Sequence, residues 1–190
     1  MADLMTYRDA VAEGLAREMR RDPDVVCLGE DIGAAGGVFK TTVGLLAEFG
    51  PDRVRDTPIS EQAIVGMAMG AAMTGIRPVA EIMFSDFLAC CWDYLANEIP
   101  KMRYMTGGQV TIPLVIRTAN GGGLGFGAQH IERRLGYLLV GCLFQGQQPD
   151  LRAVPVRDDQ LVLLGDGRQA VTRHPDVLAL VIYCHWLSAA

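Results

Sequence analysis

Residues 53–83 read RVRDTPISEQAIVGMAMGAAMTGIRPVAEIM, and this stretch predicts a strand, a helix and a second strand in that order. The first strand is expected at residues 53–56, before a turn through Thr57-Pro58. Small and apolar residues then run from Glu61 to Thr74 and predict a helix. Residues 77–83 predict the second strand, where Pro78 is tolerable because it stands near the start. A helix between two strands predicts a right-handed parallel crossover.

The segments on either side continue this alternation. Thr6 to Asp9 has the T-x-x-D form of a helix start, and the helix is expected to end near Asp22-Pro23. Pro100 should break or kink a later helix near Ile99, because a proline inside a helix costs about 3 kcal/mol. We expect one α/β domain with a mostly parallel sheet sandwiched by helices. The other predicted elements are strands at 25–28 and 110–117, a helix at 42–49, and a helix from 87 to 99 capped by Ser85-Asp86.

The predicted helix from Glu61 to Thr74 is unusually rich in small residues. Each glycine in it would cost about 1 kcal/mol in helix propensity. We expect this helix to be buried and to let another backbone come close, a kind of packing that is common at subunit interfaces.

Composition excludes several classes of protein. The chain has 190 residues, half of them apolar, and a formal net charge of −5. No cluster of Lys and Arg resembles a nucleic-acid footprint. No apolar run is long enough to cross a membrane, and the N-terminus lacks the pattern of a signal peptide. The five cysteines are odd in number and without C-x-x-C spacing, which favours reduced, buried thiols in a cytoplasmic protein.

Five short motifs occur along the first 130 residues. They are Gly29-Glu30-Asp31, Gly36-Gly37-Val38-Phe39, Thr57-Pro58-Ile59-Ser60-Glu61, Gly75-Ile76-Arg77-Pro78-Val79-Ala80-Glu81 and Gly127-Ala128-Gln129-His130. Together they resemble the β subunit of the decarboxylating component of 2-oxo acid and acetoin dehydrogenase complexes. The resemblance implies a thiamine-diphosphate enzyme whose β subunit binds the cofactor's aminopyrimidine. It also implies a heterotetramer with an α subunit that holds the diphosphate through Mg²⁺, a second β subunit, and a lipoyl acyltransferase partner.

The resemblance also implies roles for particular residues. Glu61 would hydrogen-bond the pyrimidine ring nitrogen remote from the thiazolium and favour the tautomer that removes the thiazolium C2 proton. Phe87 would lie against the pyrimidine ring, and His130 near the reacting end of the cofactor, where the acyl group passes to lipoamide. Glu30 would stand at the sheet edge near the cofactor. The backbone carbonyl of Leu114 would help to hold a structural potassium ion.

Each of these residues also has an ordinary structural interpretation. Glu61 could belong to a helix cap, since an early glutamate after a serine is common there. Phe87 and His130 could be core residues, and Glu30 could cap a helix or pair with an arginine. Gly165-Asp166-Gly167 is interpreted as a turn, because no asparagine follows it as in magnesium-binding thiamine enzymes.

The resemblance is lost after His130. All nine methionines lie in residues 1–130, and the usual Ser-Gln-Ser continuation is missing. We expect a pyrimidine-binding core at 1–130 and a divergent, frame-shifted or substituted tail at 131–190 that could complete the sheet. The usual C-terminal domain is expected to be absent. Two alternatives to an active subunit remain open: a non-catalytic remnant that retains only a partner-binding surface, and a transketolase-like thiamine enzyme.

Overall fold

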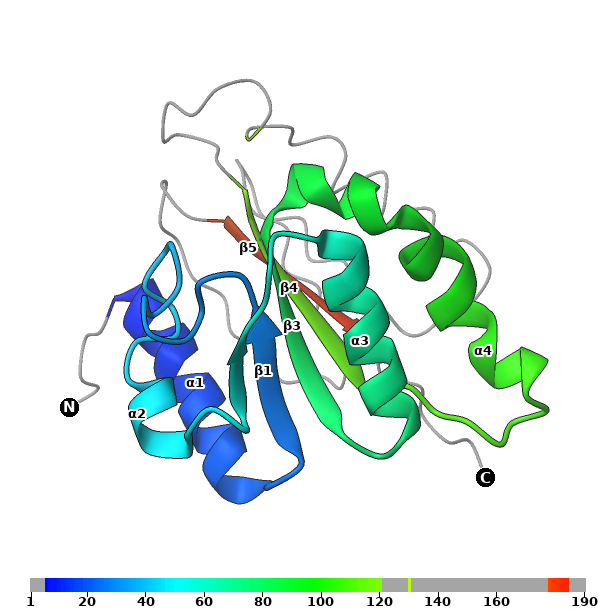
Figure 1. Cartoon of the computed structure of the whole chain (residues 1–190), viewed down its shortest axis with the longest axis horizontal. Coiled ribbons are helices and arrows are strands. Elements are labelled where there is room, and N and C mark those ends of the chain that lie inside the picture. The colour runs from blue at the N-terminus through cyan, green and yellow to red at the C-terminus, as the bar shows by residue number, and fades with distance from the viewer. Residues whose placement is uncertain (1–5, 121–129, 131–177, 185–190) are drawn as a thin grey trace.

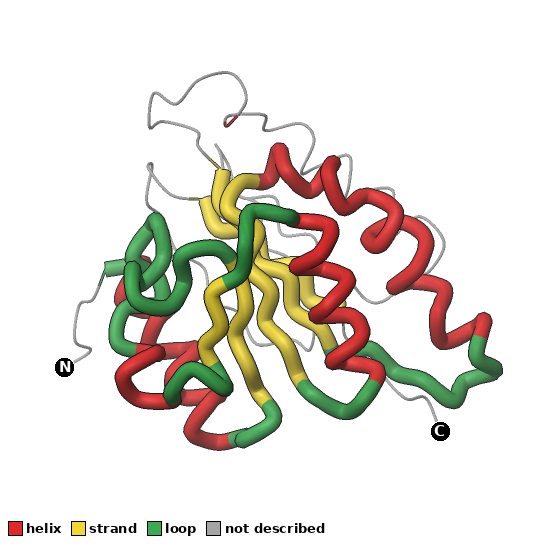
Figure 2. The backbone as a smooth tube through the Cα atoms, viewed as in Figure 1, coloured by secondary structure: helices red, strands yellow, loops and turns green. Residues whose placement is uncertain are grey.

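The computed structural model describes residues 6–120, 130 and 178–184. They form a five-stranded sheet in the order β2-β1-β3-β4-β5, flanked by helices (Figures 1 and 2). Strands β1 to β4 are parallel and β5 is antiparallel to β4, which confirms the predicted fold class. The strands are β1 (Val25–Gly29), β2 (Val54–Asp56), β3 (Arg77–Phe84), β4 (Leu114–Asn120) and β5 (Leu178–Cys184). The helices are α1 (Tyr7–Arg21), α2 (Leu45–Phe49), α3 (Glu61–Met73), the 3₁₀ helix η1 (Ser85–Cys91), the π-helix η2 (Tyr94–Glu98) and α4 (Ile99–Met105).

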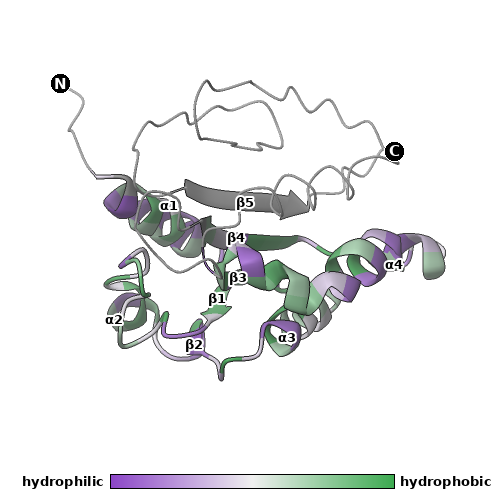
Figure 3. Cartoon of the chain, turned by 90° about the horizontal axis from the view of Figure 1, so that it is seen from above, coloured by the Kyte–Doolittle hydropathy of each residue, from purple (hydrophilic) through white to green (hydrophobic). Residues whose placement is uncertain are grey.

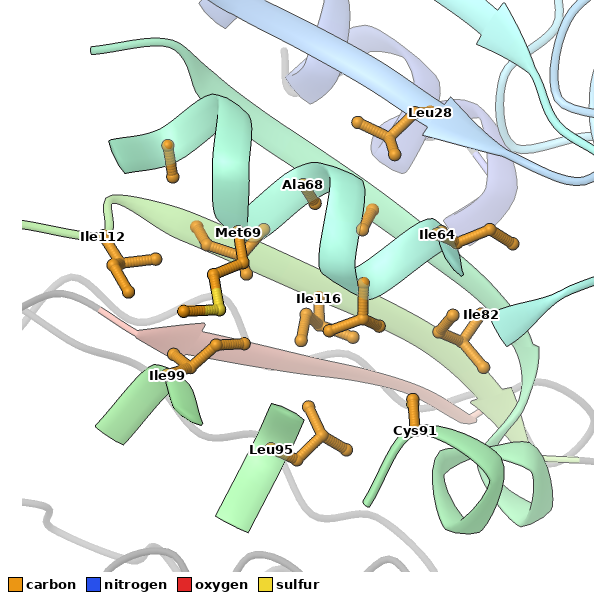
Figure 4. Packing of buried hydrophobic residues seen from close by; sticks show 14 of the residues in the cluster. Leu28, Ile64, Ala68, Met69, Ile82, Cys91, Leu95, Ile99, Ile112 and Ile116 are labelled. Atoms are coloured by element: carbon orange, nitrogen blue, oxygen red, sulfur yellow. The ribbon is translucent and has the colours of Figure 1, made fainter. Parts of the chain in front are cut away.

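Both faces of the sheet are covered, as the wholly apolar strand β1 predicts. Val25 and Cys27 pack with α1, α2 and Val54 of β2 in one apolar cluster. Val26 and Leu28 point to the opposite face and join a larger cluster with α3, η1, η2 and α4. Figure 3 shows α1 and α2 on one side of the sheet and α3 and α4 on the other. In Figure 4, side chains from α3, from the strands and from the segment between η1 and α4 converge in one apolar layer.

The first helix is held at both ends by hydrogen bonds. The side chain of Thr6 accepts a hydrogen bond from the backbone N–H of Asp9 at 3.2 Å, which confirms the predicted cap. At the other end, the Arg53 guanidinium donates to the carbonyls of Met19, Asp22 and Val25 at 2.7–3.1 Å. One side chain therefore satisfies carbonyls that the helix end leaves without partners and ties α1 to β1 and β2.

The small-residue helix α3 is buried on one face only, so the prediction of a buried helix is half correct. Ile64, Val65 and Ala68 are buried against the sheet. Met67 is 48% exposed, and a Cβ added at Gly70 would meet no atom within 4 Å. The small residues therefore leave an open outer face in this chain.

The segment from Ser85 to Met105 departs most from expectation. Ser85 and Asp86 lie inside η1 and not before it, and the buried Ser85 hydroxyl has no hydrogen-bond partner, so the predicted cap is wrong for Ser85. At the expected break near Ile99 the hydrogen-bonding pattern changes from that of the π-helix η2 to that of the α-helix α4, which starts at Ile99. Pro100 thus stands in the first turn of α4, where its missing N–H costs little.

Three other boundaries shift. The helix expected at 42–49 is shortened to α2, because Gly44 has a φ of +86° and ends the preceding turn outside helical geometry. The strand expected at 110–117 starts at Leu114 and runs three residues further. The apolar run near the C-terminus, which could have been a helix, forms β5 beside β4. Several predictions fall on residues that the structure does not describe. They are the domain boundary after residue 130, the apolar runs at 135–144 and 161–164, and the turn at 165–167.

Composition led to two further expectations: that the cysteines are buried thiols and that no segment crosses a membrane. Cys27 and Cys91 are buried free thiols as expected, whereas Cys90 is exposed. Among the residues that the structure describes, no helix is long and apolar enough to cross a membrane.

The two glycines Gly29 and Gly70 make a matched pair for a stability test. A Cβ at Gly29 would stand 2.9 Å from Glu81 Cβ and 3.0 Å from the Glu81 carbonyl oxygen, inside the sheet. We expect Gly29→Ala to destabilise the fold by about 1–3 kcal/mol, the usual range for overpacking. Gly70→Ala fills open space in a helix and should stabilise by about 0.5–1 kcal/mol. Urea unfolding of both variants tests this, and equal midpoints would contradict it.

Candidate functional site

The carboxyl ends of β1 to β4 meet at one edge of the sheet, which we call the carboxyl edge. Glu30 directly follows β1. Phe87 lies two residues beyond Ser85, the first residue after β3. Glu61 opens the helix that follows β2, and His130 comes ten residues after the end of β4. Since β2, β1, β3 and β4 are neighbours in this order, all four predicted residues stand at the edge where open α/β sheets bind ligands.

Glu61 is the first residue of α3 and is half-buried. Its predicted alternative role as a cap is not supported by geometry. The preceding residue, Ser60, makes no side-chain capping hydrogen bond, and a capping glutamate belongs two residues further along the helix. The helix N-terminus favours a negative charge at this position. Glu61 is therefore a carboxylate held at the carboxyl edge and available to a ligand.

Glu30 is the second carboxylate at this edge. Burial raises the pKa of its carboxyl, and the charges of Asp31 and Glu61 raise that pKa further. The effect of Glu61 shows that the two glutamates are within electrostatic reach of each other. A folded state that holds the Glu30 proton more tightly than the unfolded state loses stability as pH rises through the raised pKa. In the described part of the chain Glu30 forms no ion pair with an arginine, so the predicted pairing alternative is not found.

Aromatic rings gather at the same edge. The Phe87 and His130 rings lie edge to face with centroids 5.4 Å apart. Phe84 contacts both, at 5.9 Å from Phe87 and 4.6 Å from His130, and Phe39 contacts Phe84 at 5.5 Å. Phe87 also packs against the larger apolar cluster, which agrees with its core interpretation, and its role at the site stays a prediction. Sequence reasoning missed Phe84 and gave Phe39 no role of its own, although Phe39 ends one of the five motifs.

The carboxyl edge also holds polar atoms without partners. The buried hydroxyl oxygens of Thr57, after β2, and Ser85, after β3, make no hydrogen bond in the described structure. Such atoms are rare in folded proteins and suit a site that a ligand completes. Carboxylates and hydroxyls can hydrogen-bond the nitrogens of a flat ring, and aromatic side chains can lie against its face. The residues present therefore fit an aminopyrimidine.

Leu114 lies elsewhere. It is buried and is the first residue of β4, so it stands at the amino end of a strand whose carboxyl end faces the site. The described residues contain no group of three or more His, Cys, Asp or Glu side chains that could hold a metal ion. The structure thus does not bring Leu114 together with the other predicted residues, and its potassium role stays a prediction.

Removing the Glu61 charge should change the proton affinity of Glu30. We expect Glu61→Gln to lower the Glu30 pKa, because one of the charges that raise it is lost while burial and Asp31 remain. An NMR titration of the Glu30 carboxyl carbon measures the change. Glu48→Gln, on α2 and paired with Arg20, is the control that should leave the Glu30 pKa unchanged. An unaltered Glu30 pKa in Glu61→Gln would show that the two carboxylates do not interact.

The adjacent cysteines Cys90 and Cys91 should differ in their reactivity. Burial raises the pKa of the Cys91 thiol to about 12, with smaller effects from Cys90 and Glu61, and raises that of Cys27 to about 11. Cys90 is exposed. Because the thiolate is the reactive form, iodoacetamide at pH 8 should label Cys90 well before Cys91 and Cys27. Peptide mass spectrometry measures this, with labelling in guanidinium as the control, and equal native rates at Cys90 and Cys91 would contradict the described burial.

Comparison with known proteins agrees with this geometry. The acetoin:2,6-dichlorophenolindophenol oxidoreductase subunit beta of Bacillus subtilis is 44% identical over 148 residues, which are 72% of this chain and 43% of that protein. The 2-oxoisovalerate dehydrogenase subunit beta of the same organism is 44% identical over 181 residues, covering 88% of this chain and 53% of that protein. A chloroplastic pyruvate dehydrogenase E1 component subunit beta-3 of Arabidopsis thaliana is 42% identical over 163 residues, covering 82% and 40%.

The chain thus spans about half the length of these relatives or less. The alignment that covers 88% of the chain necessarily continues past residue 130. The family described as the transketolase pyrimidine-binding domain matches residues 3–139. That match spans every described residue but those of β5, and it confirms the resemblance drawn from the motifs. By its sequence and its fold, this chain belongs to the transketolase pyrimidine-binding domain family, and its relatives are β subunits of pyruvate, 2-oxoisovalerate and acetoin dehydrogenases.

Proposed function

We propose that this chain is the β subunit of a thiamine-diphosphate-dependent dehydrogenase acting on a pyruvate-like 2-oxo acid or on acetoin. The observation that carries the proposal is the meeting of Glu61, Glu30, Phe87 and His130 at the carboxyl edge. These residues follow four different strands, and a core alone requires none of the carboxylates there. The names of the relatives support the reaction class.

Glu61 would bind the cofactor's aminopyrimidine through a ring nitrogen. Glu61 is half-buried in the first turn of α3, where the helix N-terminus favours its negative charge. Its task is to hold a proton at the nitrogen it contacts, which is general acid–base work. When bound, thiamine diphosphate supplies the nucleophilic carbon and the electron sink for cleavage next to a carbonyl.

Glu30 would adjust the charge that Glu61 experiences. Burial and two neighbouring carboxylates favour the protonated form of Glu30, and their effects appear as its raised pKa. A proton taken up by Glu30 lessens the repulsion between the two side chains. We propose that Glu30 thereby limits the negative charge that surrounds a ring bound at this edge.

Phe87 would lie against the face of the pyrimidine ring, and His130 would reach the reacting end. The His130 imidazole is set edge to face with Phe84 and Phe87, an arrangement that favours one ring orientation. An oriented imidazole can place a nitrogen where a substrate oxygen or the leaving acyl group passes, and hold or release a proton there.

The diphosphate and Mg²⁺ would be bound by an α subunit. In this proposal the chain supplies the pyrimidine half of the site. The open outer face of α3 offers apolar surface to such partners. Ile59, two residues before Glu61, is 77% exposed and adds to that surface. A second β subunit and a lipoyl acyltransferase complete the proposed assembly.

Reconstitution tests the proposal. The full chain is mixed with a cognate α subunit, thiamine diphosphate and Mg²⁺, and reduction of 2,6-dichlorophenolindophenol is followed with pyruvate, a branched 2-oxo acid or acetoin. We expect activity with one of these substrates. Glu61→Gln should lower kcat by about 10²–10⁴-fold, because a positioned acid–base group contributes about that much.

The control is Glu18→Gln, which alters an exposed glutamate on α1 that pairs with Arg21. It should retain the activity of the unchanged chain. Activity that survives Glu61→Gln would refute the role of Glu61. A complex with the α subunit that never reduces the dye would favour the alternative of a partner-binding remnant.

A further inference from the structure

The middle of the sheet contains a buried ion pair that the proposed chemistry does not use. Arg117 of β4 pairs with Glu81, its register partner on β3, and both side chains are at most 10% exposed. Burial lowers the pKa of Arg117 to about 10, so it remains charged at neutral pH. Gly29 makes room for Glu81 on the other side, since any Cβ there would collide with Glu81.

Cohesion of the strands does not require this pair. Placing two charges in an apolar interior has a large desolvation cost, and well-packed apolar residues of similar volume are often as stabilising. An ion pair does provide directed hydrogen-bond donors, which apolar side chains lack. Arg117 uses one of them outside the sheet: its Nη2 donates to the Thr41 hydroxyl oxygen at 2.8 Å.

Thr41 belongs to the segment Gly33–Gly44, which we call the glycine loop. At the start of the loop, the Gly33 N–H donates to Asp56 Oδ1 at 2.6 Å, at the end of β2. Beside Thr41, the buried Thr42 hydroxyl donates to the Ile32 carbonyl at 2.7 Å. Both ends of the loop are thus held by side-chain hydrogen bonds. The residues between them include Phe39, whose ring contacts Phe84.

The ring contacts continue from the loop into the proposed site. Phe39 lies against Phe84, and Phe84 lies against Phe87 and His130. Thr41 is two residues from Phe39, so a shift of the loop at Thr41 would move the Phe39 ring. The path from the buried pair to the proposed site therefore consists of sequence neighbours and direct contacts.

We propose that Arg117, held by Glu81, is a positioning residue: through Thr41 it sets the glycine loop, and through Phe39 and Phe84 it sets the orientation of Phe87 and His130. The identity of the ligand bound against these rings rests on the proposed function above. The positioning itself is a property of the free chain.

Thr41→Val tests the proposal, because it keeps the side-chain volume and removes the acceptor for Arg117. Thr41→Ser is the matched variant that keeps the hydroxyl. In the full chain, we expect Thr41→Val to speed amide hydrogen exchange in the glycine loop by about tenfold or more, since the lost hydrogen bond is to a charged group. The His130 imidazole resonances should shift as the neighbouring rings move. Exchange should quicken more in the glycine loop than in the amides of β3 and β4, and Thr41→Ser should restore both readouts.

Arg117→Lys gives a second test within the sheet. Both Glu81 and Thr41 are contacted by Arg117 Nη2. Lysine keeps a charge for Glu81, but its ammonium ends one bond short of that position, so the loop should loosen as in Thr41→Val. Val38→Thr, at an exposed residue of the same loop, is the control and should change neither readout. With the α subunit present, Thr41→Val should also raise the Kd of thiamine diphosphate.

Two results would overturn the proposal. One is unchanged loop exchange and unchanged His130 resonances in Thr41→Val. The other is faster exchange spread equally through β3 and β4, which would show a purely structural role. If the unchanged complex binds no thiamine diphosphate, the proposed function fails, whereas the exchange and resonance measurements on the free chain still decide the positioning role.

Discussion

Four parallel strands that finish at one edge impose the main constraint on this molecule. Each strand must be covered on both faces, so β1 is apolar throughout and its side chains alternate between two clusters. The segment that follows each of these strands also begins at the same edge of the sheet. Residues as distant in sequence as Glu30 and His130 reach that edge for this reason alone. The apolar packing of α3 on β3 then sets Glu61, the first residue of that helix, beside them.

The carboxyl edge lacks many of the features that stabilise ordinary loops. Two half-buried glutamates stand within reach of each other, and hydroxyls of Thr57 and Ser85 are buried without partners. Asp31 and Lys40 adopt left-handed backbone conformations, with φ of 54° and 59°, that residues other than glycine seldom adopt. Helix α1, in contrast, follows local rules closely, as the cap at Thr6 and the Arg53 hydrogen bonds show. Such a contrast between one edge and the remainder is typical of a functional site.

Much of this could be predicted from the sequence, and the failures have physical causes. The crossover through α3 was predictable because small and apolar residues identify the helix and polar turns bound it. The 3₁₀ and π segments after β3 were not, since apolar periodicity over so few residues does not distinguish 3₁₀ and π from α hydrogen bonding. The Glu81–Arg117 pair was missed because the two residues are 36 positions apart (117 − 81) and meet only through strand register. The exposed face of α3 was missed because composition does not show which side of a helix packs against the sheet and which side faces solvent.

Gly29 shows how a motif can serve the fold and the site together. It belongs to the motif Gly29-Glu30-Asp31, whose glutamate stands at the carboxyl edge, and resemblance alone would assign the glycine to the same site. The structure gives it another reason: its missing side chain admits Glu81, and Glu81 holds the charge of Arg117 inside the sheet. Adjacent residues of one motif would therefore serve two purposes: Glu30 belongs to the proposed site, and Gly29 makes space for the buried pair. Selection for the site would then preserve both, even though only Glu30 faces the proposed cofactor.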